Sequence, residues 1–145
     1  MIRVSENAIN PEEELATFRQ GFANIGAITS FVGVVRNDGQ TETLTLSHYP
    51  GFTERQIERF VLDAEQKWSL KGCLVLHRVG KMIVGEPIVV VATAADHRRA
   101  AFEACDFLMD KLKSEAPFWK KETIKGQGRW IEPKAQDHQD LGRWS

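Results

Sequence analysis

Residues 88–95 read IVVVATAA, and this nearly continuous apolar stretch decides the fold. An apolar run of this length, rich in β-branched residues, is typical of a strand that is covered on both faces. We therefore expect it to be the central strand of a sheet. Asp96, which follows directly, can cap a helix, and the apolar face of that helix is predicted to carry Ala101, Ala104, Cys105, Leu108 and Leu112.

Further strands are predicted on both sides of this stretch. Residues 73–79 and 86–95 favour one hairpin, because glycines bound the connection between them. A second hairpin is predicted from the β-rich residues 26–36 and the alternating residues 41–49, which flank the turn sequence NDG at 37–39. Shorter strands are expected at residues 2–9, 119–124 and 129–132.

Two more helices are predicted before the central strand. One opens at Pro11 with three glutamates in its first turn, where the helix dipole favours acids, and runs to about Phe22. The other follows the break at Pro50-Gly51, and Thr53 can cap it. Its apolar side chains recur at helical spacing through Ile57, Phe60, Val61, Ala64 and Trp68.

This order of elements predicts an α+β fold. Hairpins that alternate with helices favour a sandwich in which helices pack on one face of a largely antiparallel sheet. The 145 residues are enough for one domain with a buried core. We expect a single domain over residues 1–145, with a polar tail from about residue 133.

The composition narrows the class of protein. The formal net charge is −1, so no global basic field favours nucleic acid, and any anion site must be local. No apolar run reaches the roughly 20 residues that span a bilayer, and the N-terminal residues lack the pattern of a signal peptide. We expect a cytoplasmic protein with no membrane segment. Cys73 and Cys105 make no disulfide framework and lack metal-ligand spacing, so we expect inert thiols and no metal.

The segment from Lys111 to Trp130 gathers cations around the aromatic sequence Pro117-Phe118-Trp119. A partly desolvated ammonium binds an anion more strongly, and its pKa falls toward the range useful for proton transfer. A solvated basic edge strand is the alternative interpretation, and composition does not decide between them. The cations are Lys111, Lys113, Lys120, Lys121, Lys125 and Arg129.

The sequence Asp96-His97-Arg98-Arg99 places three potential cations in the first turn of a predicted helix. The helix dipole disfavours cations there by about 0.3–1 kcal/mol each. A bound anion would reverse this effect, because backbone N–H groups and guanidinium groups would converge on it. Alternatively, Asp96 neutralises the turn and the arginines point to solvent. Both interpretations stay open.

Other features have competing explanations. Arg36 ends a β-rich run in which Gly33 would let a backbone or ligand approach closely, but a plain surface arginine is also compatible. His48 and His77 lie in predicted strands, and we interpret both as hydrogen-bonded structural histidines. A helical stripe would bring Lys113 beside Phe118 and Trp119; it consists of Phe102, Asp106, Met109 and Lys113.

Five segments together resemble the family of large, catalytic subunits of molybdopterin synthase. They are FVGVVRN (31–37), LSHYPGFTE (46–54), HRVG (77–80), HRRAAFEACDFLMDKLK (97–113) and APFWKKE (116–122). Several distinct segments in the same order are more specific than any one of them. The resemblance covers most of the chain, from about Gly26 to Trp130.

The resemblance implies a fold, a reaction and partners. The fold would be an α/β hammerhead with a small antiparallel subdomain. The reaction would convert cyclic pyranopterin monophosphate to molybdopterin by installing two sulfurs as a dithiolene. A small ubiquitin-like subunit would carry each sulfur as a thiocarboxylate on its C-terminal Gly-Gly, and a homodimer of the large subunit would bind one small subunit at each end as a heterotetramer. No metal or redox cofactor is implied.

The resemblance also assigns site residues by position. Lys113 and Lys120 match catalytic residues, which would stabilise developing negative charge or move protons. The substrate-binding residues would be Arg36, His97, Arg98, Lys120, Lys121 and Glu122, and the pocket lining Phe31, Val34, Val35 and Met109. Val34 departs from the family, since related sequences can carry lysine there. The partner's sulfur would be the nucleophile, so the chain needs no reactive cysteine.

Two other classes of protein compete with this interpretation. A non-catalytic dimeric module could hold a phosphorylated ligand or a protein tail on the same scaffold. A small RNA-binding α+β domain could use the basic segment together with Trp119 and Trp130 for stacking, although the near-neutral net charge counts against it.

Overall fold

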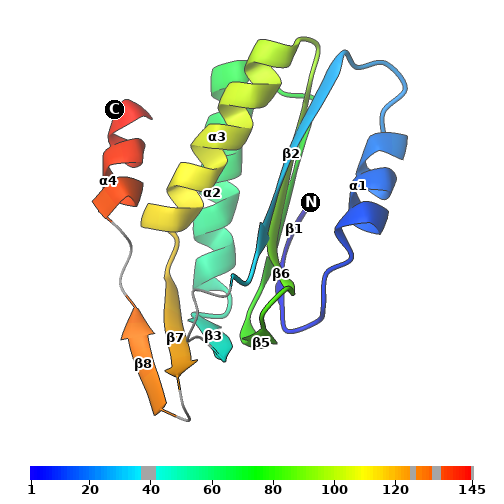
Figure 1. The fold of residues 1–145 in the computed structure, drawn as a ribbon. Coiled ribbons are helices and arrows are strands. Elements are labelled where there is room, and N and C mark those ends of the chain that lie inside the picture. Colours follow the sequence, from blue (N-terminus) through cyan, green and yellow to red (C-terminus); the bar gives the residue numbers. More distant parts are fainter. Residues whose placement is uncertain (37–41, 125–126, 132–134, 145) are drawn as a thin grey trace.

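The computed structural model describes the backbone of residues 1–36, 42–124, 127–131 and 135–144, and the side chains of residues 1–36, 42–120 and 137–144. The described elements, drawn in Figure 1, are β1 (Ile2–Ser5), α1 (Pro11–Gln20), β2 (Ala27–Val34), β3 (Thr43–His48), α2 (Phe52–Trp68), β4 (Gly72–Arg78), β5 (Gly80–Ile83), β6 (Pro87–Ala95), α3 (Arg98–Ser114), β7 (Phe118–Ile124), β8 (Gln127–Ile131), α4 (Ala135–Leu141) and the 3-10 turn η1 (Gly142–Trp144). The described strands form two four-stranded sheets, ordered β1-β4-β6-β2 and β5-β3-β7-β8.

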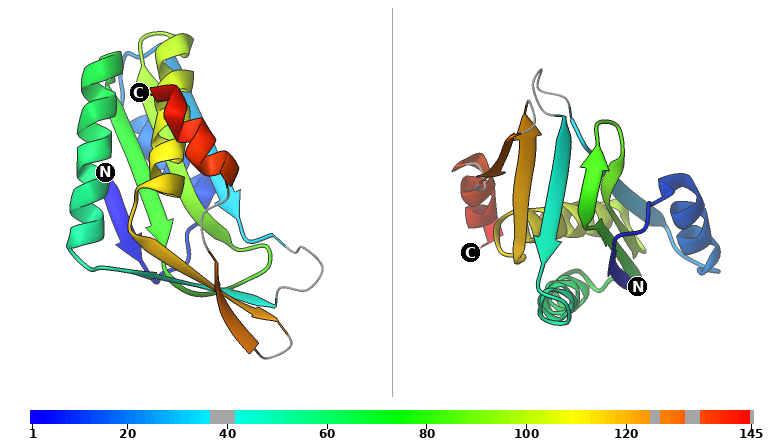
Figure 2. Two further views of the ribbon diagram at one scale, coloured as in Figure 1. Left: turned by 90° about the vertical axis from the view of Figure 1, so that its left-hand side faces the viewer. Right: turned by 90° about the horizontal axis from the view of Figure 1, so that it is seen from below.

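Strand β6 lies inside the first sheet, as its apolar sequence predicts. It pairs antiparallel with both β4 and β2. Val90 and Ala92 pack toward α1, whereas Val89 and Val91 pack toward α2 and α3. Both faces of the strand are therefore covered, and the helices occupy both faces of the sheet rather than the single face that we predicted (Figures 1 and 2).

The second sheet is the small antiparallel subdomain. It lies at one end of the first sheet, where α3 passes into β7 (Figures 1 and 2). Leu44 and Leu46 of β3 bury their side chains against Val35, Val79 and Met82, and Phe118 packs against the same cluster. This apolar contact joins the two sheets, and the α+β prediction with an added antiparallel subdomain is confirmed.

The prediction of a hairpin from residues 26–36 and 41–49 is wrong. Strand β2 pairs with β6 in the first sheet, and β3 pairs with β5 and β7 in the second. The predicted pairing of residues 73–79 with 86–95 is confirmed, with Cys73 opposite Thr93. The connection between these two strands contains β5, which belongs to the second sheet. β5 begins at Gly80, whose φ is +86°.

Both predicted helix caps are corrected. Gly51, with a φ of +84°, caps α2, and the Glu54 carboxylate accepts a hydrogen bond from the Gly51 N–H at 3.2 Å. Thr53 instead accepts from the Tyr49 N–H at 3.0 Å and donates to the Pro117 carbonyl at 3.2 Å, which ties the start of α2 to the start of β7. His97, rather than Asp96, caps α3, and its side chain makes no capping hydrogen bond.

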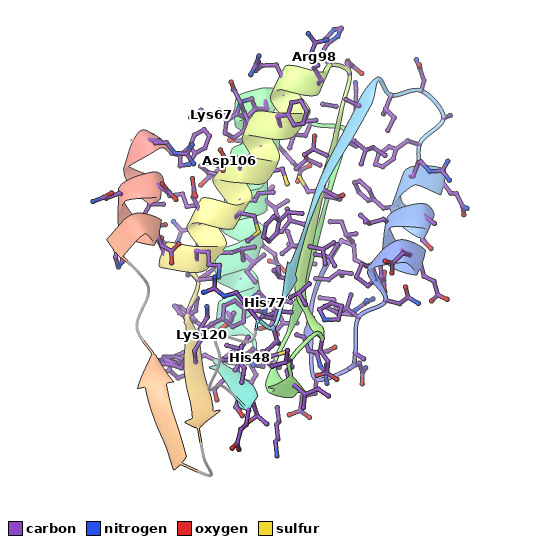
Figure 3. The ribbon with its side chains drawn as sticks, in the orientation of Figure 1. His48, Lys67, His77, Arg98, Asp106 and Lys120 are labelled. Atoms are coloured by element: carbon purple, nitrogen blue, oxygen red, sulfur yellow. The ribbon has the colours of Figure 1, made fainter. Side chains whose placement is uncertain are left out.

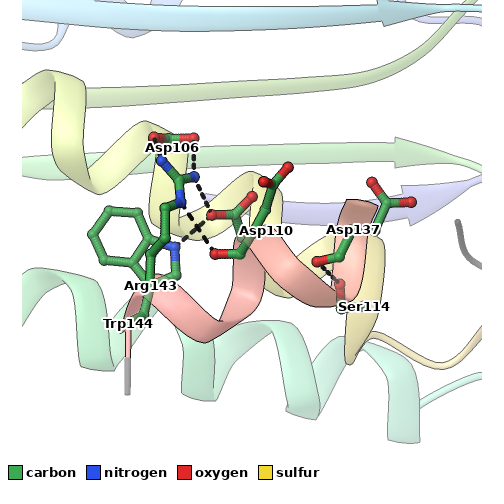
Figure 4. A network of polar contacts seen from close by, with 7 residues as sticks. Asp106, Asp110, Ser114, Asp137, Arg143 and Trp144 are labelled. Carbon is green, nitrogen blue, oxygen red and sulfur yellow. Dashed lines mark hydrogen bonds and ion pairs between the residues drawn. The ribbon is translucent and has the colours of Figure 1, made fainter. Parts of the chain in front are cut away.

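The C-terminal residues, predicted as a polar tail, fold back onto α3. The indole of Trp144 contacts the rings of Trp68 and Phe107, with centroids 5.7 and 5.6 Å away. Asp110, only 8% exposed, accepts hydrogen bonds from the Trp144 indole N–H and, at 2.7 Å, from Arg143 (Figure 4). A buried carboxylate without donors would be destabilising, so these contacts explain how Asp110 is accommodated.

No helix in the described part of the chain has the length and apolarity needed to cross a membrane.

Candidate active site

The connection from α3 to β7 brings Lys113 and Lys120 to the same end of the molecule. Helix α3 ends at Ser114, and the N–H groups of Glu115 and Ala116 donate to the Lys111 carbonyl at 2.8 and 3.1 Å. Strand β7 begins only a few residues later. Lys113 therefore lies in the last turn of the helix and Lys120 near the start of the strand.

Strand β7 presents its two faces to different surroundings. Phe118 stands opposite His48 and Lys120 opposite Leu46, so these four residues share the inner face of the second sheet. Leu46 is 2% exposed, and Lys120 is half-buried beside it in the register. Trp119 lies on the outer face, where its ring meets that of Tyr49 at 4.3 Å. The aromatic sequence is therefore divided between a core residue and a surface residue.

His77, in β4, packs against the start of β7, the strand that carries Lys120. Its ring stacks on Phe118 with centroids 3.9 Å apart and an interplanar angle of 18°. Nδ1 lies 3.0 Å from the Arg78 carbonyl oxygen. A carbonyl oxygen only accepts, so Nδ1 carries the proton and Nε2 is left with a lone pair.

The electrostatics of His77 connect it to both lysines. Burial lowers its pKa from 6.5 to about 4, against the opposing effect of the Arg78 carbonyl hydrogen bond. The charges of Lys120, Lys113 and His48 lower the pKa further. His77 is therefore neutral near pH 7. His48 of β3, His77 of β4 and Lys120 of β7 lie in the same region, beyond the end of α3 (Figure 3).

His48 occupies the edge of the same region. Its side chain is 16% exposed, and Nε2 lies 3.7 Å from a carboxylate oxygen of Glu54. That separation is too long for a hydrogen bond, so the contact is an ion pair only when His48 is protonated. From the sequence, both histidines are interpreted as structural residues, and no local pattern relates them to the lysines.

Arg36 follows the end of β2, next to a buried residue. Val35 before it is buried, donates to the Glu86 carbonyl at 2.9 Å and packs in the same cluster as Leu46 and Phe118. Arg36 itself is exposed. Val35, predicted to line the pocket, has its side chain in the apolar core, whereas Val34 is 48% exposed.

Gly33 makes room for its own sheet rather than for a ligand. A β-carbon at this position would lie 2.7 Å from Val89 Cγ1 and 3.3 Å from Phe31 Cε1. The close approach predicted at Gly33 is thus made by Val89 of the paired strand β6. Phe31, predicted to line the pocket, is 41% exposed.

His97 and Arg98 lie at the opposite end of α3 from the lysines. Both are exposed. Fifteen residues separate Arg98 from Lys113 along the helix, which corresponds to about 22 Å at about 1.5 Å per residue. Figure 3 shows Arg98 at one end of α3 and Lys120, His48 and His77 beyond the other end. A single chain therefore does not bring all the predicted cations together.

The remaining predicted residues have varied positions. Met109 is half-buried and packs against the core between the two ends of α3. Lys111 forms an i,i+4 ion pair with Glu115 at 3.1 Å, and its half-buried ammonium group lies 5.6 Å from the centre of the Phe107 ring. Lys121 and Glu122 lie in β7, but their side chains fall outside the described residues. The side chain of Arg129 in β8 and the whole of Lys125 are outside them as well.

Neither cysteine is a reactive thiol. Burial raises the pKa of both Cys73 and Cys105 to about 12, so almost no thiolate forms near pH 7. This agrees with the inert thiols expected from the sequence. The described residues also line a cavity of about 590 Å³ between α1, α2 and the start of β4, and none of the predicted site residues borders it.

The fold defines an α+β protein in which the predicted basic residues lie at the two ends of one helix, His97 and Arg98 at its start and Lys113 at its end. The model of the family described as MoaE protein matches residues 4–115. Together with relatives that are more than 40% identical over almost the whole chain, this match shows that the chain belongs to the MoaE family.

Sequence relatives and solved structures that resemble this chain carry names from molybdopterin synthesis. The molybdopterin synthase catalytic subunit of Ralstonia nicotianae is 47% identical over 146 residues, which cover 99% of this chain and 83% of that protein. The structure of molybdopterin cofactor biosynthesis protein E from Burkholderia multivorans has a TM-score of 0.85 at 41% identity and covers 99% of this chain and 95% of that one. Molybdopterin synthase from Staphylococcus aureus has a TM-score of 0.76 at 26% identity over 88% of this chain and 94% of that one. The family predicted from the sequence is confirmed.

Proposed function

We propose that the chain is the catalytic subunit of a molybdopterin synthase and acts as a sulfurtransferase that converts cyclic pyranopterin monophosphate to molybdopterin. The observation that carries the proposal is that the charges of Lys113 and Lys120 both act on the neutral His77, at the junction of the two sheets. Two ammonium groups, that of Lys120 half-buried and that of Lys113 exposed, suit a reaction in which negative charge develops on oxygen and sulfur.

The chemistry requires a sulfur nucleophile that this chain does not supply, because both of its thiols are buried and protonated. A thiocarboxylate at the C-terminal Gly-Gly of a small ubiquitin-like subunit fulfils this role. For each sulfur, a carbon–sulfur bond forms on the substrate and a carbon–oxygen bond at the same carbon breaks, so that the oxygen leaves as water or stays on the freed phosphate. Water then attacks the carbonyl carbon of the tail, and the bond between this carbon and the sulfur breaks. The tail ends as a carboxylate whose second oxygen comes from water. Lys113 and Lys120 would stabilise the oxyanions and transfer the protons.

His97 and Arg98 would bind the phosphate and pterin from a second copy of the chain. Along α3 they lie about 22 Å from Lys113 at about 1.5 Å per residue. A two-fold axis across α3 would place the start of one helix against the end of the other. Exposed apolar side chains on this side of the molecule, Phe31 at 41% and Phe102 at 54%, support such a homodimer. Arg36 would join the lysines from its own chain.

The expected assembly is a homodimer with one small subunit at each end, a heterotetramer. A cytoplasmic location, predicted from the sequence, is part of the same proposal. The C-terminal tail of the small subunit has to reach Lys113 and Lys120, which places its entry near the junction of α3 and β7.

The proposal is tested by mixing the purified chain with a thiocarboxylated small subunit and the cyclic precursor, and measuring molybdopterin. We expect Lys113→Ala and Lys120→Ala to lose activity and Arg98→Ala chiefly to weaken precursor binding. Lys111→Ala is the matched control, because Lys111 pairs with Glu115 on the helix surface. Wild-type activity in both lysine variants would refute the catalytic assignment. Binding of precursor without product in the wild type would favour the non-catalytic module, and a salt-dependent shift of RNA at physiological ionic strength would favour an RNA-binding domain.

A further inference from the structure

The ring of His77 is held in one orientation, with one of its two nitrogens left as a hydrogen-bond acceptor. Its ring is fixed on one side by the stack with Phe118 and on one edge by the hydrogen bond from Nδ1 to the Arg78 carbonyl. These two contacts leave no freedom in the orientation of the ring or in its tautomer. The lone pair of Nε2 is therefore a hydrogen-bond acceptor in a fixed position.

The groups around this acceptor are mainly cationic. The charges of Lys120 in β7, Lys113 in α3 and His48 in β3 act on the His77 ring, and a carboxylate oxygen of Glu54 in α2 lies 3.7 Å from His48 Nε2. Lys120 lies two residues beyond Phe118 on the same face of its strand, so its side chain starts beside the ring on which His77 stacks. A neutral imidazole can accept a hydrogen bond from a half-buried ammonium without adding negative charge.

We propose that His77 is a positioning residue for the sulfur-transfer site: its Nδ1–H is anchored on the Arg78 carbonyl, and its Nε2 accepts a hydrogen bond from the ammonium group of Lys120. The inference rests on the proposed function for the role of Lys120, but not for the geometry of His77. The low pKa of His77 supports it, because an imidazolium would have no acceptor and would repel the ammonium.

Two substitutions separate positioning from packing. His77→Phe keeps an aromatic ring to stack on Phe118 and removes the acceptor, whereas His77→Gln keeps a neutral acceptor of similar reach. We expect His77→Phe to lower kcat by about tenfold or more, the effect of losing a hydrogen bond to a charged group, with little change in KM for the precursor. His77→Gln should recover part of the loss.

The pH profile supplies a readout that packing alone would not move. An acceptor stabilises the protonated ammonium and so raises the pKa of the lysine. Its removal in His77→Phe should shift the basic limb of the kcat profile to lower pH. A His77→Phe enzyme with the wild-type kcat and an unmoved basic limb would overturn the proposal.

Two further measurements keep the test independent of folding and of the proposed function. In a Lys120→Ala background, His77→Phe should cause no additional loss of kcat, and multiplicative losses would contradict positioning through Lys120. In the wild type, ¹⁵N spectra of labelled histidine should show the Nδ1–H tautomer of His77 and no titration from about pH 5.5 to about pH 8. An Nε2–H tautomer, or titration near the ordinary pKa, would overturn the geometry even if the lysines prove catalytic. Full activity of Lys120→Ala with the Nδ1–H tautomer intact would instead count against the proposed function and against positioning through Lys120.

Discussion

Acid should destabilise this protein through His77 in a pH range above that of ordinary carboxylates. The unfolded chain protonates His77 below about pH 6.5, whereas the folded chain protonates it only below about pH 4. Between these values the unfolded state binds more protons, so the free energy of unfolding falls as the pH falls. The contribution of His77 is fully present above about pH 6.5 and is lost as the pH approaches about 4.

The magnitude follows from the two pKa values of His77. A difference between 6.5 and about 4, at about 1.4 kcal/mol per unit, corresponds to about 3 kcal/mol over the whole range, and the slope reaches about 1.4 kcal/mol per pH unit within it. This is a large part of the stability of a typical domain, which is about 5–15 kcal/mol.

Urea unfolding at several pH values between about 4.5 and about 7.5 measures this slope, at one protein concentration because a dimer unfolds in a concentration-dependent way. We expect His77→Phe to flatten the dependence by removing the titrating group. His97→Gln is the matched control, because His97 is exposed at the start of α3, and it should leave the slope unchanged. An equal slope in wild type and His77→Phe would show that His77 does not contribute to the pH dependence of stability.

Three further predictions concern the anchoring of the site elements and the assembly. Asp110→Ala should lower the free energy of unfolding by about 1–3 kcal/mol, because its carboxylate is 8% exposed and accepts hydrogen bonds from Arg143 and Trp144. Asp106→Ala should lower it by less, because Asp106 is more exposed and, among the described residues, pairs only with Arg143. Urea unfolding measures both losses, and equal losses would contradict this difference. Thr53→Val should destabilise by about 1–2 kcal/mol in the same assay, because the fully buried hydroxyl joins Tyr49 to Pro117; an unchanged stability would show that these two hydrogen bonds contribute nothing. Dimers that combine one Lys120→Ala chain with one Arg98→Ala chain should regain part of the activity that each variant alone lacks, and no recovery would contradict a site shared across the dimer.

The interior of the fold is well predicted by local sequence patterns. The apolar run in β6, the 3.6-residue spacing in α2 and the buried face of α3 depend on periods that the sequence displays directly. The division into two sheets depends on which strands pair, and strand pairing is not visible in a local pattern. Alternation shows that Leu44 and Leu46 face a core, but it does not show that this core lies under a second sheet.

The C-terminal helix was missed for a similar reason. Residues 135–144 carry few apolar side chains, and among them only Trp144, near the end of the sequence, indicated a contact with the core. Its contacts with Trp68 and Phe107, and the contact of Arg143 with Asp110, are tertiary. Helices of this length depend on such packing for stability rather than on their own propensity.

The candidate site could be predicted only in part. The segment around Phe118 indicated that Lys113 and Lys120 lie near one another, because a short connection joins the end of a helix to the start of a strand. The resemblance assigns Arg98 and Lys113 to one site, although the length of the predicted helix already places them far apart within one chain. The role that we infer for His77 depends on its stack and on a backbone carbonyl, neither of which is encoded in a local pattern.

The proposed function depends most on Lys113 and Lys120 acting in sulfur transfer at the junction of α3 and β7. A single-turnover assay of Lys120→Ala with saturating thiocarboxylated small subunit and precursor tests it most directly, because substrate binding and product release do not limit that rate. We expect a loss of about 100-fold or more in the rate of molybdopterin formation, with binding of the small subunit retained. A single-turnover rate equal to that of the wild type would contradict it.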